Sequence, residues 1–286
     1  MNHSTFASSA HIGICLALAG APSALAQPAR TAPAEPPYQE DVQLDEGDGP
    51  WRFEFNSWIW LMGVEGDVGV RGVTADVSAD FGDIIDASDS VVAFSGHLEV
   101  GYGPFAGFVD GLYADLGADD QSGPAGMAQV DVEFQQTIVD FGLMYRLGTW
   151  EPSGDAALNR HDTTLDLYAG ARYNGLEIEV RPANLPDRSS DKDWFDPIIG
   201  AKAVLPIARD WHVRLNGDVG GFGVASDLTW SATAVIGYDF LVFNHPATVL
   251  GGYRAIGWDY SDGSGTSEFT WDIIQHGPIL GFSLGF

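Results

Sequence analysis

The chain has 286 residues, of which 45% are hydrophobic and 36 are glycine, and its mean hydropathy is close to zero. This composition excludes a disordered chain and a bundle of transmembrane helices, and it fits one β-barrel or β-sandwich domain. The formal net charge is −27, from 13 basic and 40 acidic residues, which disfavours nucleic acid or any other polyanionic partner.

The first 26 residues have the pattern of a cleaved export signal. An apolar stretch at 12–20 precedes a small-residue cleavage pattern at 24–26, and it is too short to cross a bilayer as a helix. Residues 27–50 combine five prolines with an acidic run, so we predict a disordered periplasmic tail. The only cysteine, Cys15, lies in the signal, and the mature chain should therefore contain none.

Residues 51–286 are predicted to form a barrel of ten strands, in which apolar residues alternate with polar or small ones. This alternation fits a wall that meets lipid on one face and a crowded lumen on the other. Short connections make neighbouring strands antiparallel, and an even number of strands places both termini on the periplasmic side. The expected strands cover residues 51–62, 91–102, 105–116, 127–147, 165–174, 194–207, 211–223, 227–241, 247–261 and 267–286.

Residues 64–87 lie between the first two expected strands and have a different character. Glycines interrupt their β-branched residues before the short sequence FGDII, which predicts a hairpin and a helical turn in an extracellular loop. The same segment could instead supply two more barrel strands. Two more strands would make twelve. A count of eight also stays open as an alternative to ten.

The last expected strand ends on an aromatic residue, Phe286. Its second half carries large apolar residues on one face and glycine, serine or glutamine on the other. It resembles the C-terminal strand of bacterial outer-membrane β-barrels, in which the terminal aromatic residue helps the assembly machinery to recognise the protein. The resemblance implies that Phe286 is a barrel-assembly signal.

Four longer stretches resemble a widespread group of proteobacterial outer-membrane β-barrel proteins that carries only a generic barrel description. The stretches are SGHLEVGYGPFAGFVDGLYADLG (95–117), LDLYAGARY (165–173), DWFDPIIGAKAVLPIARDWHVRLNGDVGGFGVASDLTWSATAVIGYDF (193–240) and GYRAIGWDY (252–260). The resemblance covers most of residues 51–286. It implies a fold and a compartment, and it offers no catalytic residues to carry over.

Ionisable residues on the predicted inward faces balance in sign, with six acids and six bases. Because an unpaired charge in a narrow lumen is costly, we predict a salt-bridge network that fills the lumen rather than an open selective channel. A narrow pore or a ligand-binding lumen is the alternative. The twelve residues are Arg52, Glu54, Glu99, Asp110, Asp140, Arg146, Asp166, Arg172, Lys202, Arg214, Asp218 and Arg254.

Three arrangements could carry chemistry, and we favour none of them. The row Ser95, His97, Glu99 has the order of an activated nucleophile, but an inward face is the wrong place for a lipid-modifying hydrolase. An omptin-like protease would need a histidine at the extracellular rim, whereas His212 begins a strand beside a periplasmic turn. Acidic loops at 115–120 and 187–196 could hold Ca²⁺ but lack EF-hand spacing. We therefore predict no catalytic residues, no cofactor and no metal site.

Together these observations predict an all-β protein, a single closed antiparallel up-and-down barrel in the cell outer membrane. Its expected role is structural or interactive in the Gram-negative envelope, with a narrow porin-like channel as the alternative and a lipid-modifying hydrolase third. The expected partners are outer-membrane lipid, lipopolysaccharide and the barrel assembly machinery. The sequence leaves the oligomeric state open, since fold alone does not decide function.

Overall fold

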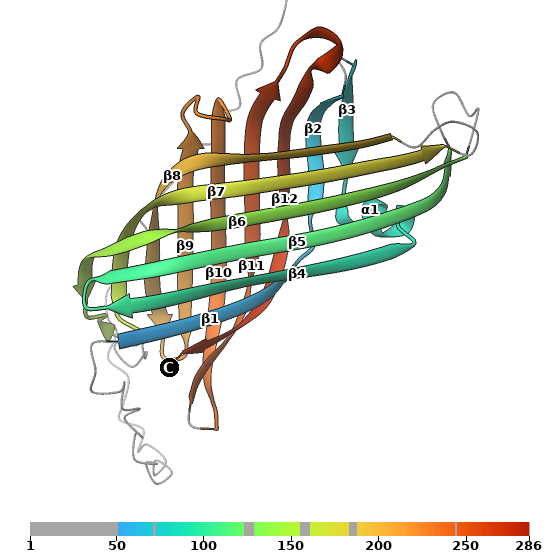
Figure 1. Ribbon diagram of the computed structural model, residues 1–286. Coiled ribbons are helices and arrows are strands. Elements are labelled where there is room, and N and C mark those ends of the chain that lie inside the picture. The colour runs from blue at the N-terminus through green and yellow to red at the C-terminus, as the bar shows by residue number, and fades with distance from the viewer. Residues whose placement is uncertain are drawn as a thin grey trace, which may run out of the picture. The chain divides into compact units, whose positions relative to one another are not determined.

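The computed structural model describes residues 51–70, 73–122, 129–154, 161–182, 188–243 and 245–285. The predicted signal, the predicted tail and Phe286 lie outside these residues. Ten strands form a closed antiparallel barrel, because β1 pairs with β4 on one side and with β12 on the other (Figure 1). They are β1 (Trp51–Trp60), β4 (Ser90–Tyr102), β5 (Phe105–Ser122), β6 (Gln129–Trp150), β7 (Thr163–Pro182), β8 (Arg188–Ala208), β9 (Trp211–Gly221), β10 (Leu228–Val242), β11 (His245–Asp262) and β12 (Phe269–Gly285). The predicted ten-stranded barrel is confirmed.

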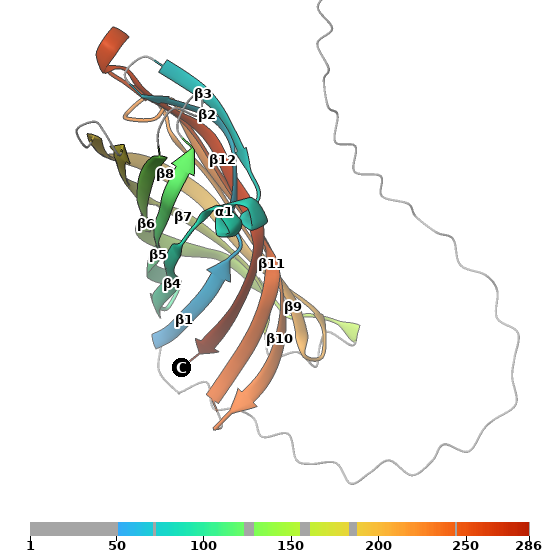
Figure 2. The same ribbon diagram turned by 90° about the vertical axis from the view of Figure 1, so that its right-hand side faces the viewer.

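The two further strands, β2 (Gly63–Val70) and β3 (Val73–Ala79), form the predicted hairpin. β2 pairs with the first half of β12, beyond the point where β1 ends, and β3 is an edge of the described sheet (Figure 2). The predicted helical turn is α1 (Phe81–Ala87), which begins at a capping box between Asp80 and Asp83. No helix in the described part of the chain is long and apolar enough to cross a membrane.

Two barrel ends can be distinguished. The terminal end is where β1 begins and β12 ends, and the loop end is where the β2–β3 hairpin and the turn after β11, with its short 3-10 helix η3 (Gly265–Ser267), lie (Figure 1). Figure 1 also shows β4–β8 crossing in front of β9–β12 at a steep angle. The two sets of strands form opposite walls of the barrel.

The outer surface is apolar over a band that starts at the terminal end. Its rim there carries exposed aromatic pairs, Trp51 with Tyr102 and Trp211 with Tyr238, whose ring centroids are 4.9 and 5.0 Å apart. Aromatic rings of this kind mark membrane interfaces. Large apolar side chains above the rim are exposed, among them Ile59, Leu98, Leu143, Ile199 and Leu280.

The apolar band ends partway along the longer strands. On β7 and β8 the last aromatic pair is Tyr173 with Phe195, whose ring centroids are 4.9 Å apart. Beyond it the same outer face carries acids, such as Glu177 and Asp193, both exposed. About ten residues of a tilted strand span a bilayer, whereas β7 has 20 residues and β8 has 21. The loop halves of these strands therefore project beyond the membrane, as the change of character within β6 predicts.

The same projection corrects two predicted boundaries. β5 continues to Ser122 and β8 already begins at Arg188, so much of the two acidic segments proposed as Ca²⁺-binding loops is paired β-strand. Those loop assignments were wrong because polar residues on both faces were interpreted as irregular structure. Outside the bilayer, a strand can expose polar residues without losing its backbone hydrogen bonds.

Candidate functional site in the barrel lumen

The lumen has two contrasting halves. The terminal half contains ionisable side chains, and the loop half contains a buried apolar cluster in which Trp194, Ile256, Trp258, Trp271 and Ile273 are at most 5% exposed. β-Sheet register explains the arrangement of charges. His97, Asp110, Asp140 and Arg172 occupy directly paired positions on β4, β5, β6 and β7, so their side chains form one row on the inner wall.

Arg172 is the centre of this row, and it is completely buried. Its guanidinium donates two hydrogen bonds of 2.8 Å to the carboxylate of Asp140, and Nη2 also lies 3.0 Å from Oδ1 of Asp218. Its Nη1 donates to Thr229 Oγ1 at 3.0 Å, and that hydroxyl donates in turn to the carbonyl of Gly257. The carboxylates of Asp140 and Asp218 thus share one guanidinium, and its Nε, Nη1 and Nη2 all donate hydrogen bonds.

A second group lies nearer the terminal end. The ammonium of Lys202 is 2.6 Å from Glu99 and 3.5 Å from Glu54, and Arg214 hydrogen-bonds to Glu54. The pairs join β8 to β4 and β9 to β1. These four residues therefore connect strands that are not neighbours in the sheet, across the lumen.

Two residues of the row Ser95, His97, Glu99 have partners on neighbouring strands. Ser95 donates its hydroxyl hydrogen to the carbonyl of Trp58. Nδ1 of His97 lies 3.3 Å from Asp110, and Nε2 lies 3.8 Å from Glu99. Both ring nitrogens of His97 thus face carboxylates.

Arg254 connects the charged half to the aromatic half. Its Nη2 lies 3.1 Å from Oδ1 of Asp110, while the guanidinium carbon stands 5.7 and 5.5 Å from the ring centroids of Trp58 and Trp60. Contacts of this kind combine an ion pair with cation–π attraction.

Two predicted arginines remain. Arg146 forms a two-pronged pair with Asp166 at 2.6 and 3.0 Å. Arg52 instead donates to the carbonyl of Gly103 at 2.7 Å, in the turn at the terminal end. Eleven of the twelve predicted residues therefore lie in salt bridges, and a buried network inside the barrel is present.

Uncharged side chains also cross the lumen. Gln136 and Gln275 exchange reciprocal amide hydrogen bonds of 3.2 and 2.7 Å between β6 and β12, and both are 1% exposed. The rings of Trp194 and Tyr260 stack at 4.1 Å between β8 and β11. Below these contacts lies a cavity of about 120 Å³, which is lined by charged residues on one side and by Val235, Leu250 and Ile279 of the apolar cluster on the other.

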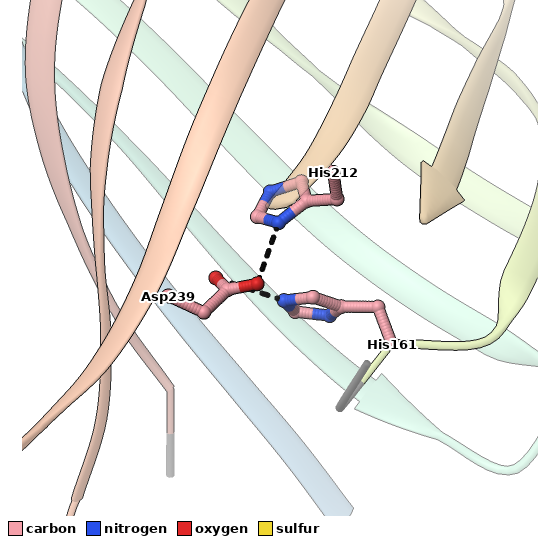
Figure 3. Close-up of side chains that lie close together, drawn as sticks. All are labelled: His161, His212 and Asp239. Atoms are coloured by element: carbon pink, nitrogen blue, oxygen red, sulfur yellow. Dashed lines mark hydrogen bonds and ion pairs between the residues drawn. The ribbon is translucent and has the colours of Figure 1, made fainter. Parts of the chain in front are cut away.

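Sequence reasoning missed one group of side chains at the terminal end (Figure 3). Nε2 of His161 lies 3.2 Å from Oδ1 of Asp239, and Nδ1 of His212 lies 2.9 Å from Oδ2. Strand alternation places His212 and Asp239 on inner faces, and this signal was available. His161 precedes β7 in a connection without periodicity, so nothing in the sequence associates it with the other two.

No protein-family model matches the sequence, and no curated protein matches it. Similar solved structures include Ail, the attachment invasion locus protein of Yersinia pestis, at 10% identity and a TM-score of 0.34, covering 83% of this chain and 99% of that one. Neisserial surface protein A (NspA) is 13% identical with a TM-score of 0.29 (84% and 100% covered). The translocator domain of the autotransporter NalP from Neisseria meningitidis is 13% identical with a TM-score of 0.37 (84% and 90%).

No sequence family is identified. The predicted resemblance to outer-membrane β-barrels is confirmed by features of this chain itself. The closed antiparallel sheet, the exposed apolar band and the aromatic rims are those of an outer-membrane β-barrel.

Proposed function

We propose that this protein is a barrel with a closed lumen, and that its role in the cell envelope is structural or interactive. The observation that carries the proposal is the set of contacts across the lumen between strands that are not neighbours in the sheet. The Gln136–Gln275 pair and the Trp194–Tyr260 stack cross the loop half, while Arg254–Asp110 and Lys202–Glu99 cross the terminal half. A solute would have to part all of them.

Opening such a lumen is energetically unfavourable for two reasons. Separating a buried ion pair leaves charges without partners, at a cost of about 3–5 kcal/mol for each broken pair. Parting the apolar cluster exposes aromatic side chains that bury about 150–250 Å² each. The ion pairs and the apolar cluster lie at different levels of the lumen. Removing the ion pairs therefore leaves the energetic cost of opening the apolar cluster unchanged.

A narrow channel is the second candidate, and the cavity is the observation that favours it. At about 120 Å³ it has room for roughly ten water molecules, if each needs 10–15 Å³. Val235, Leu250 and Ile279 of the apolar cluster line this cavity, however, which favours a chamber in the terminal half over a continuous path.

The loop end supports an interaction role. Residues 63–89 contain seven acidic residues and one basic residue, Arg71. The described parts of this segment form the β2–β3 hairpin, which extends to the loop end, and α1, which lies at the base of the hairpin (Figure 2). A strongly acidic projection suits a basic protein surface or lipopolysaccharide that is cross-bridged by divalent cations.

Single-channel recording of the purified protein in a planar bilayer tests the closed lumen. We expect no stable current steps, and we expect the same for the Arg214→Ala, Arg254→Ala double variant, because the apolar cluster remains. A Lys192→Met variant, which removes a charge at the loop end, is the matched control. Stable steps in the wild-type protein that change in the double variant and not in the control would establish a channel instead.

A further inference from the structure

The group at the terminal end consists of two imidazoles and one carboxylate from three separate segments (Figure 3). His161 lies two residues before β7, His212 is the second residue of β9, and Asp239 lies near the end of β10. One ligand atom from each residue lies within 4.8 Å of the other two, and the histidine ring centroids are 4.3 Å apart. His212 and Asp239 are buried, whereas the side chain of His161 is 32% exposed.

We propose that His161, His212 and Asp239 bind a divalent transition metal ion of the Zn²⁺ class. Two imidazole nitrogens and a carboxylate oxygen are ligands that zinc prefers, with bond lengths of about 2.0–2.2 Å. Ca²⁺ and Mg²⁺ require a shell made of oxygen atoms, which this group does not provide. Three protein ligands leave a fourth tetrahedral position for water or an external ligand, on the side where His161 is exposed.

The surroundings hold the two buried ligands in place. Thr248 donates its hydroxyl hydrogen to Oδ1 of Asp239 at 2.7 Å, and a hydrogen bond of this kind orients a ligating carboxylate in metal sites. Gly237 faces His212 across the β9–β10 ladder, and a Cβ atom there would come within 2.5 Å of the imidazole ring. Glycine at this position lets the ring lie over β10 and reach Asp239.

Arg214 competes with metal binding, because it holds His212 in one tautomer. Its Nε donates to Nε2 of His212 at 3.0 Å, so the proton of the neutral imidazole is on Nδ1, which faces Asp239. Coordination through Nδ1 requires that proton to move to Nε2, and Arg214 must then withdraw its own N–H. The imidazole stays neutral, so no proton is gained or lost at His212. Arg214 keeps a second partner, Glu54, when it withdraws.

Metal binding would also fix a connection. His161 lies two residues before β7 at the terminal end, and coordination ties this point of the chain to the barrel wall at β9 and β10.

Titration of the full chain in detergent with ZnCl₂, followed by calorimetry, tests the site. We expect one Zn²⁺ per chain, and the visible absorption of bound Co²⁺ should have the intensity of a tetrahedral complex. His161→Ala should weaken Zn²⁺ binding by more than 100-fold, since loss of a residue that only hydrogen-bonds to a metal ligand already costs about 10- to 100-fold. His161 is partly exposed, so this variant should fold. His245→Ala, another exposed histidine at the terminal end, is the matched control and should bind like the wild type.

Equal binding by the wild type and His161→Ala, or none by the wild type, would overturn the proposal. Arg214→Met provides an independent test, because it removes both the competing N–H and a positive charge. We expect at least a tenfold increase in Zn²⁺ affinity, with Lys192→Met unchanged. An affinity for Arg214→Met equal to that of the wild type would exclude coordination by Nδ1 of His212.

Discussion

The two halves of the barrel have opposite arrangements of charged and apolar side chains. Within the apolar band, up to the level of Tyr173 and Phe195, the outer wall faces lipid and the interior holds the ion-pair network around Arg172. Beyond that level the outer wall is acidic, and the interior is the apolar cluster that includes Trp194 and Trp271. Within the membrane the barrel is apolar outside and charged inside, whereas beyond the membrane it is charged outside and apolar inside, like a soluble barrel. Each half therefore buries the kind of side chain that lipid or water would solvate poorly.

The halves also differ in which interaction they leave incomplete. In the apolar cluster the indole N–H groups of Trp60, Trp258 and Trp271 are buried, and no hydrogen-bond partner is found among the described residues. Each such group costs about 1–3 kcal/mol, which the burial of the large rings must offset. Arg172, by contrast, donates hydrogen bonds from Nε, Nη1 and Nη2. The indoles of the apolar cluster therefore depend on packing, whereas Arg172 depends on hydrogen bonds.

The largest effect is expected from Arg172→Met, which breaks the charged half alone. The substitution leaves Asp140 and Asp218 buried without their cation, so we expect a loss of about 3–5 kcal/mol in the free energy of unfolding. Urea unfolding of the refolded barrel, followed by tryptophan fluorescence, measures it.

The control for this change removes the whole cluster. Arg172→Met combined with Asp140→Asn and Asp218→Asn carries no charge at this level, and it should recover a large part of the lost stability, since replacing complete buried ion clusters is often nearly neutral. If the triple variant is as unstable as Arg172→Met, the loss comes from packing around the side chain and not from unpaired charge.

Ile256→Ala breaks the apolar half in the same way. Ile256 is 0% exposed, and truncating a fully buried isoleucine to alanine costs roughly 2–5 kcal/mol through lost burial and the cavity left behind. The same unfolding experiment measures it, with Ile85→Ala as the control because Ile85 is exposed on α1. A change for Ile256→Ala as small as that of the control would mean that the loop half is not packed as a core.

The sequence was sufficient for the ten strands, their inner faces and eleven residues of the ion-pair network, whereas Arg52 bonds to a backbone carbonyl instead. Strand alternation supplies all three, because it reports which face each residue occupies. It does not report which residues meet across the lumen: Asp110 and Arg254 are 144 positions apart on strands that are not neighbours. The apolar cluster was also missed, since an inner face was equated with a polar one. An inner face need not be polar where the strands leave the bilayer. The two acidic strand segments were mistaken for loops because strands outside the bilayer can also expose polar residues on their outer faces.

The boundary between the halves can be tested at Thr229. Its hydroxyl accepts from Arg172 and donates to the carbonyl of Gly257, next to Ile256. Thr229→Val keeps the shape and removes both hydrogen bonds, which should cost about 1–3 kcal/mol. In the Arg172→Met background one of the two bonds is already absent, so the same substitution should cost less there. Additive losses in the double variant would show that Thr229 and Arg172 act independently.

The smallest effect is expected outside both halves, at the exposed pair of Lys192 and Asp262. Their side chains are 2.6 Å apart at the loop end, beyond the Tyr173–Phe195 level and therefore outside the membrane-spanning segments. The hydrogen bond from Lys192 holds the pKa of the Asp262 carboxyl below its usual value. Because the folded-state pKa is the lower one, the pair stabilises the fold above the pKa of the unfolded chain, near pH 4. That contribution disappears as the pH falls through the folded-state value.

Lys192→Met should therefore be slightly less stable than the wild type at pH 7, and the two should converge as the pH falls below about 4 or as salt screens the exposed charges. Unfolding free energies measured along a pH series at low and high salt test this. A difference that persists at low pH would have another cause, because the ammonium of Lys192 also lies 5.8 Å from the ring centroid of Phe269. In that case Lys192 would stabilise the fold through its cation–π contact with Phe269, a member of the buried apolar cluster, and not through its ion pair with Asp262.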